Sequence, residues 1–266
     1  MTDLWVAQDR LGADGSDDSG RPVLVLLHGL GHTAHVWDRF TELVNGPWIA
    51  PDLSGHGRSR WAKRYSFGNF AADVANAVAG TLHEAVPQER PLVVVGHSMG
   101  GAVALALAAG TFGIPVRAAV GFGIKVSWTG DELSAMRARA ARPPRVFASE
   151  AEARAAFVRF AGLEGIDGAG PGSVLADSGV QAVEGGYRLS TDPRTMLVGA
   201  PPMAAMLAGA AVPVVLAAGE HDHMVTREQL EALDERAEIL PDLGHNLHVT
   251  HPERLLALVE RVGAAG

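Results

Sequence analysis

Residues 91–110 read PLVVVGHSMGGAVALALAAG, and this stretch decides the fold. The run 91–95 is short, continuous and apolar, which predicts a strand buried on both faces. Residues 101–109 are rich in alanine and leucine and predict a helix. Between them, residues 96–100 form a G-x-S-x-G string centred on Ser98. A strand that turns through such a string directly into a helix predicts a sharp turn, with an exposed serine hydroxyl at the carboxyl edge of a sheet.

The glycines at positions 96 and 100 belong to the same prediction, because side chains two residues before and after Ser98 would collide across the turn. We therefore expect a strained Ser98 backbone and a hydroxyl near the positive end of the following helix. The string alone is a weak signal, since a plain glycine-rich loop between a strand and a helix would also contain it. The flanking strand and helix are what favour a nucleophile turn.

Outward from this stretch, apolar runs alternate with amphipathic segments toward both ends of the chain. Strands are predicted at residues 22–27, 48–50, within 116–126, at 212–217 and at 237–240, and helices at 35–44, 67–86, 226–236 and 251–262. Such alternation is typical of a mostly parallel sheet with helices on both faces. The predicted fold class is therefore α/β, with a mostly parallel, doubly wound sheet.

Residues 127–211 break this alternation. Helices are predicted at 132–142 and 151–160, and residues 162–186 are rich in glycine with few large apolar side chains. No convincing buried strand is evident in the segment. A stretch this long inside an α/β domain indicates a functional insertion. We therefore expect an insertion at 127–211 over the top of the sheet, and a core made of residues 1–126 and 212–266.

The composition excludes several classes of protein. The chain has 266 residues, of which 47% are hydrophobic and 20% charged, which excludes a disordered protein. The net charge of −8 disfavours a nucleic-acid partner, and the lack of cysteine excludes disulfides and a thiolate nucleophile. No apolar stretch reaches about 18 residues, so no membrane span is expected. The first residues have no basic and apolar regions of the kind found in secretory signals, so we do not expect one. We expect a cytoplasmic protein that acts on a small molecule.

A serine hydroxyl needs a base, and the base needs an orienting carboxylate, before the serine can act as a nucleophile at neutral pH. His245 is the predicted base, because it follows the last short strand and a glycine. Asp222 is the predicted carboxylate, because it directly follows the buried strand at 212–217. Glu220 and Asp242 are its rivals; the first precedes Asp222 on the same turn, and the second is too close in sequence to His245.

The histidines of the last third raise a metal site as an alternative. There are five of them: His221, His223, His245, His248 and His251. We expect His248 and His251 to be surface or helix-capping residues, and the side chains of His221 and His223 to diverge on their turn. Metal sites need converging ligands, so we predict no metal and no cofactor.

A tetrahedral intermediate of acyl transfer also needs hydrogen-bond donors for its oxyanion. The backbone N–H of Met99 is one candidate, because Met99 follows the nucleophile at the start of a helix. The second candidate is the backbone N–H of Leu30, in the loop that follows the strand ending at His28-Gly29. We expect His28 and His32, which flank this donor, to structure the loop rather than to transfer protons.

Taken together, these features resemble the α/β-hydrolase superfamily. The resemblance is carried, in the family's order, by His28-Gly29, Asp52-x-x-Gly55-x-Gly57-x-Ser59, Gly96-x-Ser98-x-Gly100, Asp222 and Gly244-His245. It implies that the loop from Asp52 to Ser59 lies beside the site in a structural role. It also implies that residues 127–211 are the family's helical cap, inserted after the sixth strand of the sheet.

Within that family, a serine at position 98 argues against dehalogenases and epoxide hydrolases, which use an aspartate nucleophile. A single glycine before Leu30 argues against lipases of the HGGG type, and thioesterases that share the GHSMG string are a lesser alternative. We predict a serine hydrolase of small, mostly apolar carboxylic esters, with His28, Lys125 and Trp128 as candidate pocket residues. Two alternatives stay open: a carbon–carbon bond hydrolase or cofactor-free oxygenase with the same triad, and a receptor-like ligand-binding module without efficient turnover.

Overall fold

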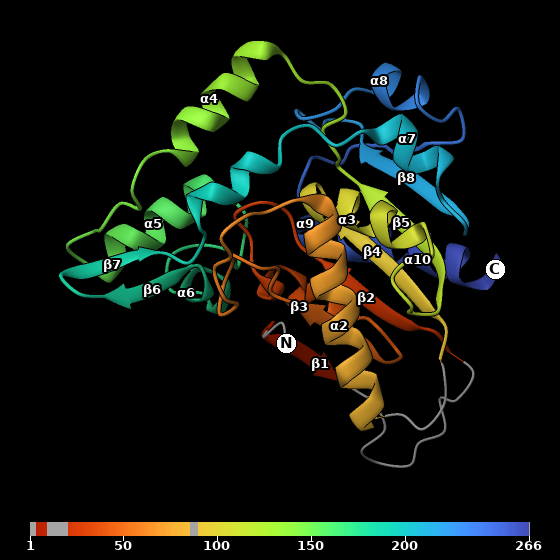
Figure 1. The fold of residues 1–266 in the computed structure, drawn as a ribbon, viewed down its shortest axis with the longest axis horizontal. Helices are drawn as coiled ribbons and strands as arrows, with labels where there is room; N and C mark the ends of the chain where they lie inside the picture. The colour runs from red at the N-terminus through yellow and green to blue at the C-terminus, as the bar shows by residue number, and fades with distance from the viewer. Residues whose placement is uncertain (1–3, 10–20, 86–89, 266) are drawn as a thin grey trace.

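The computed structural model describes residues 4–9, 21–85 and 90–265. Residues 1–3 of the N-terminus and Val86, the predicted end of one helix, lie outside this part. The described chain forms a seven-stranded sheet in the order β1-β3-β2-β4-β5-β8-β9 (Figure 1). Its strands are β1 (Val6–Asp9), β2 (Val23–Leu27), β3 (Trp48–Pro51), β4 (Leu92–His97), β5 (Val116–Phe122), β8 (Val214–Gly219) and β9 (Glu238–Leu240).

All strand pairs of this sheet are parallel except that of β1 with β3, which is antiparallel. The predicted α/β class and mostly parallel sheet are therefore confirmed. The edge strand β1 was not predicted, because its sequence VAQD is short and half exposed. The six other strands overlap the segments predicted from the apolar runs.

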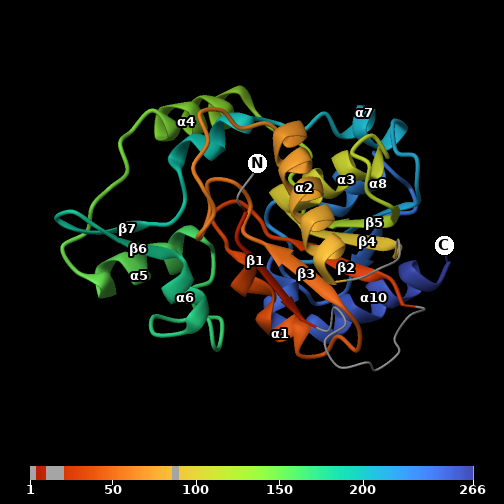
Figure 2. The same cartoon turned by 60° about the horizontal axis from the view of Figure 1, so that its bottom comes forward.

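Helices cover both faces of the sheet, as Figure 2 shows with the sheet seen nearly edge-on. The helices α2 (Phe67–Ala85) and α3 (Met99–Ala108) lie on one face, and α1 (Asp38–Thr41) and α10 (Pro252–Ala265) on the other. Successive side chains of a strand point to opposite faces of the sheet. Val25 packs in a cluster with Val103 on one face, whereas Leu26 packs with Trp37 and Leu255 on the other. Each fully buried aliphatic side chain of this kind contributes about 1.5–3 kcal/mol. The sheet is thus fixed from both sides.

The segment 127–211 lies between β5 and β8 and extends to one side of the sheet (Figure 1). It contains α4 (Gly130–Ala140), α5 (Glu150–Phe160), α6 (Val174–Ser178), β6 (Val180–Val183), β7 (Gly186–Leu189), η2 (Pro193–Val198) and α7 (Met203–Ala208). The two predicted helices correspond to α4 and α5. The hairpin of β6 and β7 was missed, because its strands are only half-buried and lack the continuous apolar run of a core strand.

Parts of this segment are packed into the core. Phe157 of α5 is fully buried in the same apolar cluster as Trp37, and Met203 of α7 packs with Leu105 of α3. The segment follows the fifth strand along the described chain rather than a sixth. Its boundaries at 127 and 211 stay a prediction.

Three further short helices complete the fold: η1 (Ala34–Trp37), α8 (Arg227–Glu231) and α9 (Leu247–Thr250). Helix α8 is shorter than the predicted 226–236, because the Asp234 carboxylate accepts the N–H of Arg236 at 3.0 Å in a local turn that competes with the helix. None of the helices in the described part of the chain is both long and apolar enough to cross a membrane.

Candidate active site

Ser98 occupies the turn between β4 and α3. Strand β4 ends at His97 and α3 begins at Met99, so Ser98 is the single residue between them. Its backbone has φ 51° and ψ −116°, in the region that non-glycine residues rarely adopt. The Ser98 N–H donates to the carbonyl of Phe122 at 2.8 Å, which ties the turn to the neighbouring strand β5. The serine is therefore held in the strained conformation that the sequence predicted.

The turn has no room for a side chain at either of its two glycines, Gly96 and Gly100. A β-carbon at Gly96 would lie 2.2 Å from the carbonyl oxygen of Gly100. A β-carbon at Gly100 would lie 2.3 Å from the carbonyl oxygen of Leu27, on β2. Both distances are far below van der Waals contact, so neither position accepts alanine without movement of the backbone.

His245 and Asp222 form a hydrogen-bonded pair on the loops that follow β9 and β8. The Nδ1 atom of His245 lies 3.0 Å from both carboxylate oxygens of Asp222. The Asp222 side chain is buried and also accepts the N–H of Met224 at 2.7 Å. A carboxylate can only accept, so Nδ1 of His245 carries the proton and Nε2 keeps its lone pair.

Two glycines bring these loops together. A β-carbon at Gly219 would lie 2.2 Å from the carbonyl oxygen of Leu243, so the absence of one lets the loop after β9 pass close to the end of β8. Gly123, directly after β5, has φ 62°, and a β-carbon there would lie 3.2 Å from His245 Nδ1 and 3.3 Å from Asp222 Oδ2. The pair is thus enclosed by backbone on two sides.

Leu30 and Met99 line the same cavity as Ser98 and His245. In the described part of the chain, neither backbone N–H of these two residues has a protein acceptor. The loop of Leu30 comes close to the nucleophile because residue 29 is a glycine, whose β-carbon would lie 3.3 Å from Ser98 Cβ. The structure therefore leaves both N–H groups free to bind an oxygen of a ligand. No hydrogen bond between the Ser98 hydroxyl and His245 is recorded among the described residues; such contacts often tighten only when substrate binds.

The cavity has a volume of about 310 Å³ and a mainly apolar lining. Lys125 and Trp128 both line it, as predicted from their place at the start of the insertion. The Lys125 ammonium is 2.9 Å from a carboxylate oxygen of Glu132, which pairs its charge. Sequence reasoning missed other lining residues from three regions: Phe67 on α2; Met136, Arg139 and Phe160 on α4 and α5; and Val198 at the end of η2. Helix α4 has no clear apolar face, so its sequence gave no sign of which side meets the cavity.

His28 does not line the cavity, which corrects its prediction as a pocket residue. It is fully buried, with Nδ1 donating to the carbonyl of Gly29 at 2.8 Å and Nε2 accepting the N–H of Leu53 at 2.9 Å. Burial, with a contribution from nearby His56, lowers the pKa of His28 well below its ordinary value. Both ring nitrogens are used in fixing two loops, so His28 is a neutral structural residue.

The rival carboxylates lie apart from the pair. Glu220 and Asp242 are exposed, and Glu220 accepts the backbone N–H of Asp242 at 3.1 Å. Neither is hydrogen-bonded to His245. The loop from Asp52 to Ser59 is structural, as the resemblance implied: the Asp52 carboxylate accepts the N–H groups of Ala34 and Arg58, at 2.7 and 2.9 Å.

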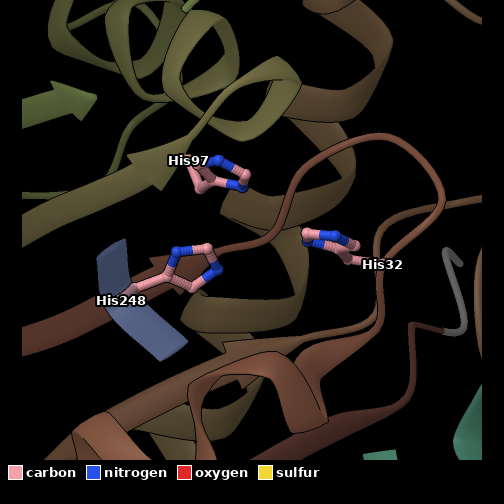
Figure 3. A group of neighbouring side chains, drawn as sticks. All are labelled: His32, His97 and His248. Atoms are coloured by element: carbon pink, nitrogen blue, oxygen red, sulfur yellow. The ribbon is translucent and has the colours of Figure 1, made fainter. Parts of the chain in front are cut away.

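The five histidines of the last third do not converge. His221, His223 and His251 are exposed, and the ring of His223 packs edge-on against His245 with centroids 5.2 Å apart. The prediction for His248 is wrong, because this residue is fully buried. Its ring lies beside His32 and His97, two residues far away in the sequence (Figure 3).

Comparisons with known proteins agree with this architecture. The sequence model described as "Alpha/beta hydrolase family" matches residues 24–258. Lipase LipV of Mycobacterium tuberculosis is 42% identical over 92 residues, which are 34% of this chain and 33% of that protein. Esterase Rv0045c of the same organism is 38% identical over 89 residues, which are 33% of this chain and 28% of that protein. The matched region therefore spans about a third of these curated relatives.

Among solved structures, E-2-(acetamidomethylene)succinate hydrolase has a similar fold. It superposes with a TM-score of 0.71 over 98% of this chain and 99% of that one, at 21% sequence identity. At this identity the likeness supports the fold alone.

Proposed function

The chain belongs to the alpha/beta hydrolase family, and from that premise we propose that it is a serine esterase of small, mostly apolar carboxylic esters. The observation that carries the proposal is the hydrogen-bonded Asp222–His245 pair, whose histidine lines the same cavity as the strained Ser98. The esterase and lipase names of the relatives point in the same direction. A charge-paired lysine and a mainly apolar lining fit a neutral substrate.

In the proposed mechanism, the Ser98 oxygen attacks the ester carbonyl while Nε2 of His245 takes the hydroxyl proton. The Asp222 carboxylate keeps the Nδ1 proton in place and stabilises the imidazolium that forms. The N–H groups of Leu30 and Met99 hold the oxyanion of the tetrahedral intermediate. His245 then returns its proton to the departing alcohol. A water molecule, activated in the same way, releases the acid from the acyl-enzyme.

We further propose that residues 127–211 form the lid over this cavity and set its specificity. Trp128, Met136 and Phe160 support this role, because they come from the insertion and line the same cavity as Ser98. The acyl and alcohol groups of the substrate would therefore be selected by the insertion, while the chemistry would be carried by the core.

The test is labelling by a fluorophosphonate, read by intact mass, together with hydrolysis of p-nitrophenyl butyrate. We expect a single adduct on the wild type and none on Ser98→Ala, which should lose about 10⁴–10⁶-fold in kcat while keeping its fold. The matched control is Ser134→Ala, which alters an exposed serine on α4 and should label fully.

Labelling or turnover that persists in Ser98→Ala would refute the proposal. An adduct without turnover of any ester would favour the carbon–carbon bond hydrolase or oxygenase reading. Saturable ligand binding with neither adduct nor product would favour a binding module.

A further inference from the structure

Three buried histidines from distant parts of the chain meet beneath the candidate active site. His32 lies in the loop after β2, His97 is the last residue of β4, and His248 lies on α9 (Figure 3). Their side chains are 3%, 1% and 0% exposed. One ring nitrogen from each lies within 4.8 Å of those from the other two. The rings face one common space, with centroids of His97 and His248 only 4.3 Å apart.

The ring nitrogens of this cluster lack the hydrogen bonds that buried polar atoms normally make. In the described part of the chain, His32 Nδ1 and both nitrogens of His248 have no hydrogen-bond partner, and the ring of His97 has only a weak contact with the backbone of His245. Burying such groups without partners is costly, so an unsatisfied cluster of this size needs an explanation. A ligand that accepts electron pairs from several imidazoles at once would give these nitrogens the partners that they lack.

The surroundings of His32 match those of a metal ligand. Its Nε2 lies 2.8 Å from the carbonyl oxygen of Ala161. Because a carbonyl only accepts, Nε2 carries the proton, and the buried Nδ1 keeps a lone pair that has no hydrogen-bond partner in the described part of the chain. Histidine ligands in proteins almost always donate their second ring N–H to a carbonyl or carboxylate in this way.

We propose that His32, His97 and His248 bind a divalent transition ion such as Zn²⁺, and that this ion inhibits the neighbouring active site. Imidazole donors favour zinc, copper and nickel over magnesium and calcium. Tetrahedral Zn–N bonds of about 2.1 Å place nitrogens about 3.4 Å apart, so nitrogens that lie within 4.8 Å of one another must draw together by at most about 1.4 Å. His32 and His97 also line the cavity, which provides the path of entry.

The protonation state of the cluster supports this site. Burial lowers the pKa of His32 to about 4 and those of His97 and His248 well below the ordinary value, with neighbouring histidines adding to the effect. A nearby backbone group of His245 opposes the shift at His97 to a smaller extent. All three imidazoles are therefore neutral at pH 7, and a metal ion need not displace protons from them.

Inhibition follows from the place of the cluster. The rings of His97 and His245 have centroids 4.5 Å apart, and His97 immediately precedes Ser98. An ion that draws the His97 ring toward His32 and His248 would shift a residue that is bonded to Ser98 and packed on His245, and so disturb the alignment of nucleophile and base that the proposed mechanism requires. This inhibitory effect rests on the proposed function, whereas the binding site itself does not.

The test measures binding and activity separately. Intact protein is titrated with Zn²⁺ against a chromogenic chelator, and with Co²⁺ while its visible absorption is followed. We expect one ion per chain, a Co²⁺ spectrum of low coordination number, and loss of p-nitrophenyl butyrate hydrolysis that is reversed by chelator. The variants His248→Phe and His248→Gln should weaken Zn²⁺ binding by more than about 100-fold, because loss of a supporting contact alone costs 10–100-fold.

The matched control is His221→Ala, which removes the histidine of an exposed group with Glu220 and Asp242. It should bind Zn²⁺ like the wild type. The site is refuted if wild type binds no stoichiometric ion, if both folded His248 variants bind as tightly, or if His221→Ala abolishes binding. If the protein hydrolyses no ester, the Co²⁺ spectrum and stoichiometry still decide the site, so the two failures are distinguishable.

Discussion

Replacement of Asp222 by asparagine is the sharpest test of how the candidate base is oriented. The carboxylate accepts two hydrogen bonds, from His245 Nδ1 at 3.0 Å and from the Met224 N–H at 2.7 Å. An asparagine amide replaces one of the two carboxylate oxygens by an NH₂ group, which cannot accept, and both of these positions lie 3.0 Å from His245 Nδ1. If the oxygen keeps the Met224 N–H, the NH₂ group takes the place of Oδ2 and donates toward Nδ1, which favours the tautomer of His245 with its proton on Nε2.

The other orientation of the amide places NH₂ against the Met224 N–H at 2.7 Å, a contact between two donors that is strongly unfavourable. The tautomer with Nε2 protonated therefore dominates in Asp222→Asn, and it cannot take the proton of Ser98. We expect kcat to fall about 10⁴-fold, equivalent to about 5 kcal/mol of transition-state stabilisation. Esters of p-nitrophenol give the rate, and circular dichroism shows that the variant is folded.

The matched control is Glu220→Gln, which neutralises the nearby exposed carboxylate that accepts the Asp242 N–H. It should change kcat by less than about twofold, because surface charges of this kind contribute little. The reasoning is refuted if Asp222→Asn keeps more than a tenth of wild-type activity, or if the control falls as far.

Two further predictions follow from the described geometry. Gly123→Ala places a β-carbon 3.2 Å from His245 Nδ1, at a position with φ 62°, so we expect about 10-fold lower kcat with little change in KM. The control is Gly113→Ala, at a position with φ 71° and no atom within 4 Å of the added β-carbon. Its backbone strain has a similar cost of about 1 kcal/mol, and it should keep full kcat. Equal kcat in the two variants would contradict crowding of the pair. Burial lowers the pKa of His56 to about 4. The unfolded chain binds a proton at this residue below about pH 6.5 and the folded chain does not. The contribution of His56 to the free energy of unfolding should therefore drop by up to about 3 kcal/mol as the pH falls from 6.5 to 4. Urea unfolding at several pH values should show a shallower drop for His56→Gln, and an identical drop would exclude His56 as a cause.

Much of the fold could be predicted, because buried parallel strands and the turn at Ser98 leave strong local signals. Continuous apolar runs identified every strand of the sheet except β1, which is short and half exposed at the edge. The pairing of His245 with Asp222 was also predictable, since each lies in the loop after a strand whose carboxyl end is at the same edge of the sheet. The catalytic roles of these residues stay predictions until they are tested.

The features that could not be predicted from the sequence depend on contacts between distant segments. His248 was predicted to be a surface or helix-capping residue, because nothing in residues 243–248 shows that its neighbours are His32 and His97. His28 was assigned to the pocket, because its motif lies beside the cavity while its ring points to the backbone of Leu53. Neither ring orientation has a local signature in sequence.

The anchoring of the insertion limits how the cavity can open. Helix α5 is anchored by Phe157, which is fully buried in the core cluster. The loop that follows α5 is anchored by Asn246, whose Nδ2 donates to the carbonyl of Gly162 at 2.8 Å. Helix α4, by contrast, buries only Ala140 among its residues. A rigid swing of the whole insertion would break core packing, whereas displacement of α4 alone would not. Ligand exchange should therefore proceed by a small hinged gate on the microsecond to millisecond timescale, with the rest of the insertion acting as a fixed wall that preserves the shape of the pocket through each opening.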